Sequence, residues 1–173
     1  CVLEVGVGTG CISLSIATER PQTRVYATDL SPQAIALATR NRDALELQER
    51  VELIECDLVE DVPAELAQSF SVLVSNPPYI PTNVLEQEVP AEVKGFEPEL
   101  ALDGGEDGLD IYRRLLEAAP YMLLPGGMLC VELYEGHLDK AAHLAEEQGV
   151  WESVEVIEDL THRPRILVAR LAK

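Results

Sequence analysis

The sequence predicts an α/β fold in which helices wind over both faces of a mostly parallel, Rossmann-like sheet. Short runs rich in Val, Leu and Ile alternate with longer segments of helical spacing along the 173 residues. Most of these short runs place apolar residues in succession instead of alternating them strictly with polar ones, as in strands covered on both faces. A cluster of glycines follows the first run directly, where a doubly wound sheet commonly turns into its first helix. Right-handed crossovers are expected to join such alternating elements.

Seven short runs are predicted to be strands because they are rich in β-branched and large aliphatic residues. The last two are joined through Asp159 to Pro164, without a helical segment between them. The predicted strands cover residues 1–5, 23–29, 51–56, 70–75, 128–133, 152–157 and 165–170.

Four segments with apolar residues at helical spacing are predicted to be helices. Ser31 suits an N-cap and Pro32 suits the first helical position of the second segment. Gly149 ends the last helix. Pro63 lies in a connection where we expect a helical turn, and the Pro-Gly-Gly at 125–127 predicts a turn before the fifth strand. The predicted helices cover residues 11–20, 32–47, 109–124 and 138–148.

The charge balance disfavours nucleic acid as a partner. Thirty-one Asp and Glu residues outnumber thirteen Lys and Arg residues, which gives a formal net charge of -18. Most of such a surface would repel a phosphate backbone. No apolar run approaches the roughly 20 residues of a membrane span, and no basic leader precedes an apolar stretch. We therefore expect a cytoplasmic protein that makes no membrane contact.

The length and the cysteines both fit an ordinary single domain. The four cysteines are far apart and form no C-x-x-C pair, so they are predicted to be small buried hydrophobes. No metal site is predicted, and such cysteine usage fits a reducing compartment. The sequence opens at Cys1 inside a predicted strand without an initiator Met. We expect residues 1–173 to form one domain of a chain that is cropped at its N-terminus.

The glycine-rich turn after the first strand is the first candidate binding site. Three glycines at every second position let the backbone turn tightly and approach a ligand without Cβ clashes. A dinucleotide fingerprint would require a glycine where Cys11 stands, which disfavours NAD and FAD. A turn with packing value only remains the alternative. The candidate cofactor-binding residues here are Glu4, Gly6, Val7, Gly8, Thr9 and Gly10.

Acidic residues at two further strand ends are suited to a nucleoside. Asp29 ends the second strand nineteen residues after Gly10, where its carboxylate can accept hydrogen bonds from both ribose hydroxyls. Leu30 follows it and belongs to the same predicted set. After the third strand, Asp57 would accept from the exocyclic amine of an adenine while Leu58 packs on the ring. Solvated strand ends are the alternative for both positions.

The strongest signal follows the fourth strand, where Asn76, Pro77, Pro78 and Tyr79 stand in succession. The prolines fix φ and remove two backbone donors, which leaves carbonyl acceptors beside the Asn76 side chain. Such acceptors can hold a planar NH₂ group whose delocalised lone pair attacks carbon poorly. A catalyst must orient that group while charge develops on its nitrogen. These four residues are the predicted catalytic residues, and Asn76 is also expected to contact the donor.

Four features together resemble a known family, the release-factor glutamine methyltransferases, also called HemK or PrmC. They are EVGVGTG at 4–10, the strand-end Asp29, NPPYI at 76–80 and FEPELALDGGEDGL at 96–109. The resemblance covers nearly the whole chain. NPPY alone is shared with adenine and cytosine amino-methyltransferases, whereas its combination with the later motif is much narrower. Leu58 departs from the family, whose members often have an aromatic residue there.

The resemblance implies a seven-stranded fold of the S-adenosylmethionine-dependent class I methyltransferases. It implies S-adenosylmethionine as donor and S-adenosylhomocysteine as product. The substrate would be the side-chain amide nitrogen, N5, of the glutamine in a release factor's Gly-Gly-Gln loop, which takes part in translation termination. The glycine turn, Asp29, Leu58 and Asn76 would face the donor, and residues 76–79 would hold the glutamine. The family's helical N-terminal domain, which helps to recognise the protein substrate, is expected to be absent from this chain.

A long loop with a marked acidic bias begins with residues 76–79, which we call the acceptor motif, or the acceptor turn. Residues 76–108 are predicted to be loop, and 86–110 contain nine acidic residues and one lysine. Long ordered loops are usually functional, although plain disorder is the alternative. We expect the acidic stretch from Glu86 to Asp110 to steer a positively charged protein partner, with Phe96 and Pro98 closing over the site. A solvated acidic surface without a partner is the alternative.

The sequence therefore predicts an enzyme that methylates the glutamine amide of a peptide chain release factor. Two other functions remain open. One is N6-adenine methylation in RNA or DNA, which requires a basic face. The other is a catalytically silent module that only binds S-adenosylmethionine, which a broken acceptor motif would indicate.

Overall fold

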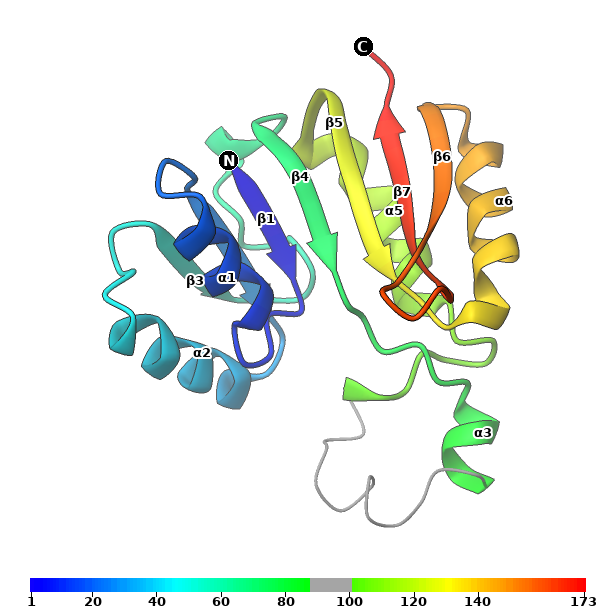
Figure 1. Cartoon of the computed structure of the whole chain (residues 1–173), viewed down its shortest axis with the longest axis horizontal. Coiled ribbons are helices and arrows are strands. Elements are labelled where there is room, and N and C mark those ends of the chain that lie inside the picture. Colours follow the sequence, from blue (N-terminus) through cyan, green and yellow to red (C-terminus); the bar gives the residue numbers. More distant parts are fainter. Residues whose placement is uncertain (88–100) are drawn as a thin grey trace.

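A computed structural model describes residues 1–87 and 101–173 of the chain. Within these residues the strands form one sheet in the order β3-β2-β1-β4-β5-β7-β6 (Figure 1). β1 to β5 are parallel to one another, and β7 is antiparallel to both β5 and β6. The predicted α/β class with a mostly parallel seven-stranded sheet is confirmed.

The strands lie close to the positions that the apolar runs predict. Because β1 to β5 are parallel, their carboxyl ends meet at one edge of the sheet, at the bottom of Figure 1. This edge carries the turns in which the sequence predicts the binding site. The strands are β1 Val2–Val5, β2 Val25–Asp29, β3 Val51–Glu55, β4 Phe70–Ser75, β5 Leu123–Glu132, β6 Trp151–Glu158 and β7 Pro164–Leu171.

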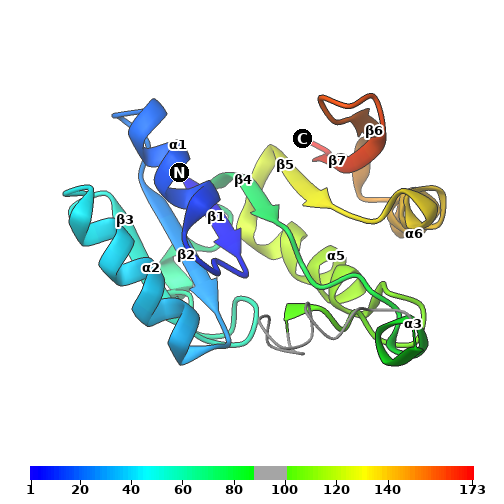
Figure 2. The same ribbon diagram turned by 60° about the horizontal axis from the view of Figure 1, so that its bottom comes forward.

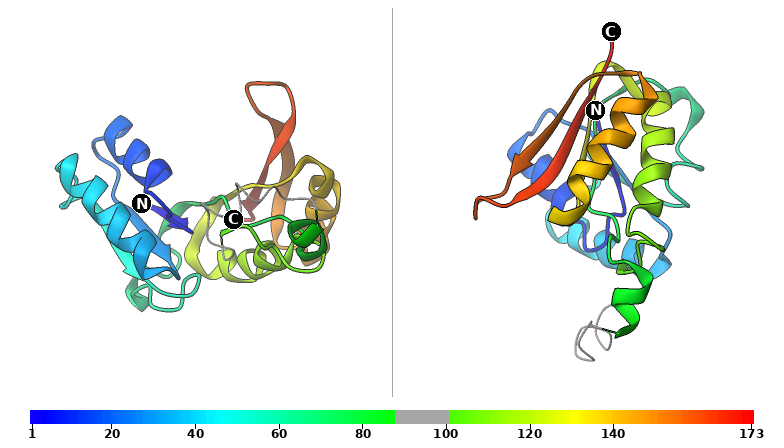
Figure 3. Two further views of the ribbon diagram at one scale, coloured as in Figure 1. Left: turned by 90° about the horizontal axis from the view of Figure 1, so that it is seen from below. Right: turned by 90° about the vertical axis from the view of Figure 1, so that its right-hand side faces the viewer.

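Helices cover the sheet on both faces, as Figures 2 and 3 show. α1 and α2 lie on one face, and α5 and α6 lie on the other. A further helix, α3, lies beyond the carboxyl edge of the strands (Figure 1). The elements are α1 Cys11–Glu19, α2 Pro32–Ala44, α3 Thr82–Gln87, α5 Asp110–Met122 and α6 Leu138–Gln148, with short 3-10 turns at Ala64–Leu66 (η1) and Glu135–His137 (η3).

The alternation of side chains along β1 builds a core on each face. Leu3 and Val5 pack into the larger cluster, with Leu115 of α5. Val2 packs into the smaller cluster, with Leu14 of α1. All four residues of β1, Glu4 included, are buried, as the mostly apolar run predicts for a central strand.

Three sequence-based predictions need correction. The predicted loop 76–108 contains α3, which Thr82 begins directly after Pro81. The Pro-Gly-Gly at 125–127 lies inside β5, where it bulges out between Leu123, paired with Phe70, and Met128, paired with Val72. α2 also ends at Ala44, before the predicted 47.

The cysteines were only partly predicted. Cys56 is buried and Cys130 is half-buried, but Cys1 and Cys11 are exposed. Cys11 is exposed because it is the first residue of α1, whose buried face begins at Ser13. Among the described residues, no group of three His, Cys, Asp or Glu side chains is arranged to hold a metal ion. No helix of the described chain is long and apolar enough to cross a membrane.

Candidate active site

The glycine turn after β1 forms a concave stretch of backbone. The N–H groups of Gly6 and Val7 both donate to the carbonyl of Thr28 at 2.9 Å, which ties the turn to the end of β2. Gly6 and Gly8 have φ of +80° and +53°, and a Cβ added to either would meet no atom within 4 Å. Both positions therefore favour glycine and border open space, as a ligand cradle requires.

The third glycine of the turn has a different task. Gly10 has φ of +86°, and an added Cβ would lie 2.9 Å from Cδ1 of Leu14. Its N–H donates to the carbonyl of Val7 at 2.8 Å and closes the turn. Gly10 therefore allows the first turn of α1 to pack closely, whereas Gly6 and Gly8 leave room for a ligand.

Asp29 joins the glycine turn to the start of α2. Its Oδ2 accepts a hydrogen bond from the N–H of Gly8, and its Oδ1 accepts one from the N–H of Ser31, both at 2.9 Å. Each carboxylate oxygen can accept a further hydrogen bond, so the group fits the two hydroxyls of a ribose. Leu30 beside it is 51% exposed and offers an apolar side chain at the same edge.

Glu4 lies beneath the turn. It is 2% exposed, and its Oε2 accepts hydrogen bonds from the N–H and the hydroxyl of Ser13 in the first turn of α1. Burial raises the pKa of Glu4 to about 7, against the opposing effect of the Ser13 hydrogen bonds, and the nearby charge of Asp29 raises it further. In the structure the side chain of Glu4 is therefore hydrogen-bonded to Ser13 of α1. The predicted contact of Glu4 with a methyl donor remains a prediction.

The turn after β3 is held in a strained form. Leu58 has φ of 49°, which is unusual for a branched side chain. Its carbonyl accepts from the Thr28 hydroxyl at 2.6 Å, and its side chain packs partly buried against the larger core cluster. Asp57 forms an ion pair of 2.9 Å with Arg114 of α5. The predicted adenine contacts of both residues remain predictions, and the ion pair gives Asp57 a second task.

The acceptor motif emerges beside the glycine turn. Ser75 is paired with Val5 in the parallel register, and its hydroxyl donates to the Val5 carbonyl at 2.7 Å. Gly6 follows Val5 and Asn76 follows Ser75. The glycine turn and the Asn-Pro-Pro-Tyr motif therefore leave the sheet side by side. Asn76 is exposed, Pro77 is buried, and Pro78 and Tyr79 are half-buried. The structure therefore brings the glycine turn and the Asn-Pro-Pro-Tyr motif to one edge.

The described part of the later motif, residues 101–108, packs directly against the acceptor turn. Ile80 forms a parallel bridge with Asp103, donates its N–H to Leu102 at 3.0 Å and accepts from the N–H of Gly104 at 2.8 Å. A Cβ added to Gly104 would lie 2.7 Å from the Cα of Tyr79. This close backbone packing explains why glycine is needed there.

His137 is a neighbour of the acceptor turn that the sequence did not reveal. A Cβ added to Gly108 would lie 2.5 Å from Cε1 of His137 and 2.4 Å from the carbonyl oxygen of Tyr79. Desolvation lowers the pKa of His137, so the neutral imidazole is favoured. Its position just after β5, on the carboxyl edge that also carries Asn76, is the signal that could have identified it.

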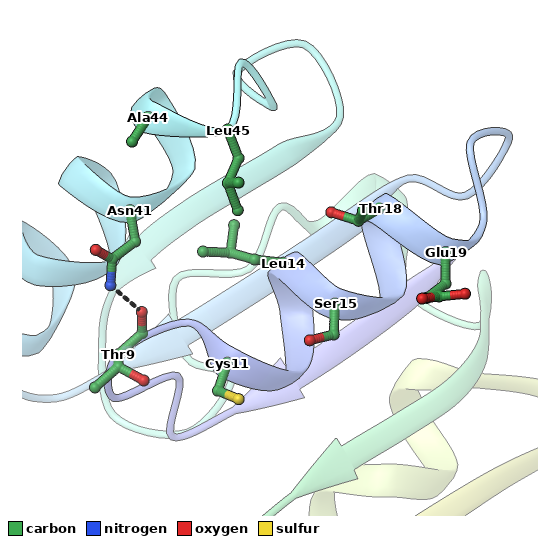
Figure 4. Close-up of a pocket in the computed structure, with 9 residues that line it drawn as sticks. All are labelled: Thr9, Cys11, Leu14, Ser15, Thr18, Glu19, Asn41, Ala44 and Leu45. Carbon is green, nitrogen blue, oxygen red and sulfur yellow. Dashed lines mark hydrogen bonds between the residues drawn. The ribbon is translucent and has the colours of Figure 1, made fainter.

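A groove lies away from this edge, between α1 and α2 (Figure 4). It measures about 500 Å³ and meets the site only at Thr9, whose carbonyl accepts from Asn41 Nδ2 at 2.8 Å. The carbonyl of Thr9 therefore points to α2, and a donor contact of Thr9 remains a prediction. The groove includes neither Asp29 nor Asn76 and is not the candidate active site.

Residues 1–93, which contain both motifs of the site, match the family model described as methyltransferase small domain. The chain belongs to this family. The crystal structure of a methyltransferase from Pyrococcus furiosus shares the fold of this methyltransferase small domain. It has a TM-score of 0.72 and 20% sequence identity over 99% of this chain and 75% of that one.

Curated relatives of this methyltransferase domain are named release factor glutamine methyltransferase. The relative from Moorella thermoacetica is 41% identical over 168 residues, which are 97% of this chain and 58% of that protein. The relative from Geobacter sulfurreducens is 46% identical over 148 residues, which are 86% of this chain and 50% of that protein. The resemblance that the motifs indicate is confirmed, and the chain spans about half the length of these relatives.

Proposed function

We propose that this domain transfers a methyl group from S-adenosylmethionine to the side-chain amide nitrogen of the glutamine in a release factor's Gly-Gly-Gln loop. The observation that carries the proposal is the juxtaposition of two turns. The exposed Asn76 and the open Gly6 each follow one residue of the hydrogen-bonded pair Ser75 and Val5. A donor in the glycine turn and an acceptor at Asn76 would therefore be neighbours.

The donor side fits an adenosyl group. Gly6 and Gly8 leave backbone space, and Asp29 presents both carboxylate oxygens from a fixed position. Bound S-adenosylmethionine supplies an electrophilic methyl group on a sulfonium. The glycine turn would hold this group, and Asp29 would accept from its ribose hydroxyls.

The acceptor side fits a planar amide. The Asn76 side-chain oxygen and the carbonyls of the proline turn would accept the two N–H bonds and orient the nitrogen toward the methyl group. Tyr79 would provide a flat wall. Methyl transfer would leave S-adenosylhomocysteine as the leaving group. The methylated amide nitrogen would lose its extra proton to water, because an amide protonated on nitrogen is strongly acidic. These residues would therefore contribute position and electrostatics in place of a strong base.

The proposed partner is a peptide chain release factor, as the names of the curated relatives suggest. The formal charge of -18 opposes binding of a nucleic acid backbone to this chain. The complete Asn-Pro-Pro-Tyr motif opposes the alternative of a silent binding module. A cytoplasmic location follows from this substrate and is part of the proposal.

The test is incubation of the chain with isotopically labelled S-adenosylmethionine and either a Gly-Gly-Gln peptide or an intact release factor. Mass spectrometry is expected to find one labelled methyl group on the glutamine side chain. The variant Asn76→Ala is the control. Labelling of an adenine-containing oligonucleotide, with both glutamine substrates unlabelled, would establish the rival function.

A further inference from the structure

The two prolines of the acceptor turn make its position depend on hydrogen bonds from outside the turn. Pro77 and Pro78 have no N–H, so neither residue can fix the turn by donating a backbone hydrogen bond. Two residues on, Ile80 makes backbone hydrogen bonds to Leu102 and Gly104, at 3.0 and 2.8 Å. The position of the turn therefore depends on residues more than twenty positions later in the chain.

Residues 102–108, which we call the brace, run alongside the end of the turn. The N–H of Thr82 donates to the carbonyl of Gly105 at 2.9 Å, and its hydroxyl donates to Asp103 at 2.8 Å. Gly104 and Gly108 approach the backbone of Tyr79 too closely for any side chain. Contacts on both sides of Ile80 thus transmit the position of the brace to Tyr79.

One carboxylate fixes the brace to the helices of the α5 face. Oδ1 and Oδ2 of Asp107 accept from the two guanidinium nitrogens Nη1 and Nη2 of Arg113 at 2.9 and 2.5 Å. Oδ2 also accepts from Nζ of Lys140, on α6, at 2.6 Å. These hydrogen bonds hold the pKa of Asp107 well below its usual range. A two-pronged arginine pair with a second cation fixes orientation as well as distance.

We propose that Asp107 is a positioning residue that holds the brace against the acceptor turn and so sets where the glutamine amide meets the methyl group. The inference rests on the proposed function and deepens it. Asp107 lies on the acceptor side of the site, whereas Gly8 and Asp29 lie on the donor side. Its loss therefore weakens the orientation of the acceptor and leaves donor binding nearly unchanged.

Asp110 provides a matched control. It also pairs with Arg113, at 3.0 Å, but it is the first residue of α5 and its side chain is 58% exposed. Asp107→Asn and Asp110→Asn remove the same charge from the same stretch. The side chain of Asp110 lies against Gly105 of the brace, and Asp110→Asn keeps this packing because the two side chains have nearly the same size. A general effect of lost acidity or of a weakened Arg113 would appear in both variants, whereas release of the brace from Arg113 and Lys140 would appear only in the first.

The first measurement is amide hydrogen exchange, which needs no activity. Asp107→Asn is expected to speed exchange at Ile80 and Gly104 by about tenfold, while Asp110→Asn stays within about twofold of wild type. Equal exchange rates of the Ile80 amide in wild type and Asp107→Asn would overturn the proposal that Asp107 holds the brace in place. If Asp107→Asn does not fold, Lys140→Met removes one of the two cations and is expected to speed the same amides.

The second measurement separates turnover from binding. Asp107→Asn is expected to lower kcat for glutamine methylation by about tenfold with a donor Kd within about twofold of wild type. Asp107→Glu, which keeps the charge, is expected to have a kcat between those of wild type and Asp107→Asn. Unchanged kcat, or an equal loss in donor affinity, would overturn the positioning role. An inactive wild-type chain would instead contradict the proposed function, and hydrogen exchange would still decide whether the brace exists.

Discussion

The backbone N–H of Gly8 donates a 2.9 Å hydrogen bond to the carboxylate of Asp29, twenty-one residues later in the chain. The same carboxylate accepts from Ser31, at the N-cap of α2. One side chain thus sets the shape of the glycine turn and presents its remaining lone pairs to the site. Donor binding should depend on it twice, through the turn and through direct contact.

Asp29→Ala should therefore weaken binding of S-adenosylmethionine at least about tenfold, because hydrogen bonds to a desolvated carboxylate are worth about 1.5–3 kcal/mol. Isothermal titration calorimetry measures the effect. Asp43→Ala is a suitable control, because Asp43 forms a surface ion pair with Arg42. An unchanged donor Kd in Asp29→Ala would remove Asp29 from the site. Clear saturation with NAD, with no heat from S-adenosylmethionine, would contradict the donor assignment.

Asn76→Ala should reduce turnover far more than donor affinity. Its side chain is exposed beyond the locked pair Ser75 and Val5, where it would orient the acceptor in the transition state. Steady-state kinetics and calorimetry on the same variant separate the two effects. Equal losses in both would make Asn76 a donor ligand. Tyr79→Phe should be mild, and a loss of several orders of magnitude would assign a chemical role to the hydroxyl.

The glycines offer a matched pair of substitutions. Gly6→Ala and Gly10→Ala both force alanine to a positive φ, at a similar cost of about 1–2 kcal/mol. Only the methyl group at 10 would also meet Leu14, whereas the one at 6 would enter open space. Gly10→Ala should therefore lower Tm more than Gly6→Ala does. Gly6→Ala should weaken donor binding more than Gly10→Ala does, although it destabilises the fold less. Thermal melts and donor titrations of both variants would reveal the opposite ranking if these tasks were reversed.

Local sequence patterns predicted the features that depend on nearby residues. The glycine turn, the end of β2 at Asp29 and the acceptor motif after β4 needed only an apolar run and the residues that follow it. Parallel topology then placed them together, because the carboxyl ends of neighbouring strands share an edge.

Features that depend on distant partners could not be predicted. The bulge in β5 exists because Leu123 pairs with Phe70 before the chain resumes pairing at Met128. The pairing of Ile80 with Asp103 joins two parts of what looked like one loop, and Arg114 pairs with Asp57 across the sheet edge. Each of these features depends on a contact between residues far apart in sequence. The spacing of apolar residues along the chain gives no information about such contacts.

The described end of the acidic stretch is used within the domain. Asp103, Asp107 and Asp110 accept hydrogen bonds within the domain, from Thr82, Arg113 and Lys140. Phe96 and Pro98, which the sequence predicted to close over the site, lie outside the described residues. The side chains of Glu86, Glu88 and Glu92 also lie outside the described part of the chain, so the steering of a positively charged partner stays a prediction.

Neutralising Glu86, Glu88 and Glu92 together should slow methylation of an intact release factor at low salt. Steering between exposed charges is screened over about 8 Å at physiological salt, so wild-type methylation should also slow as salt rises. A short uncharged glutamine peptide should show little response and serves as the control substrate. A triple variant with the rate and salt response of wild type would make the stretch a solvated surface only.

Glu4 should make the stability of the fold depend on pH in a window set by its buried position. Its pKa is raised from 4.5 to about 7 in the folded chain, so the folded state retains a proton that the unfolded chain releases. The resulting stabilisation is complete below pH 4.5, declines as pH rises toward 7 and is absent above it. The decline is at most about 1.4 kcal/mol per pH unit, or about 3 kcal/mol in all.

Glu4→Gln removes this titration and keeps an oxygen that accepts from Ser13. The free energy of unfolding of the variant, minus that of wild type, should rise between pH 4.5 and 7 and then level off in urea titrations. Ser13→Ala removes a hydrogen bond that lowers the pKa of Glu4, so it should move the upper end of the window to higher pH. A difference between Glu4→Gln and wild type that stays constant from pH 4.5 to 8 would show that Glu4 ionises in the folded chain as it does in the unfolded one.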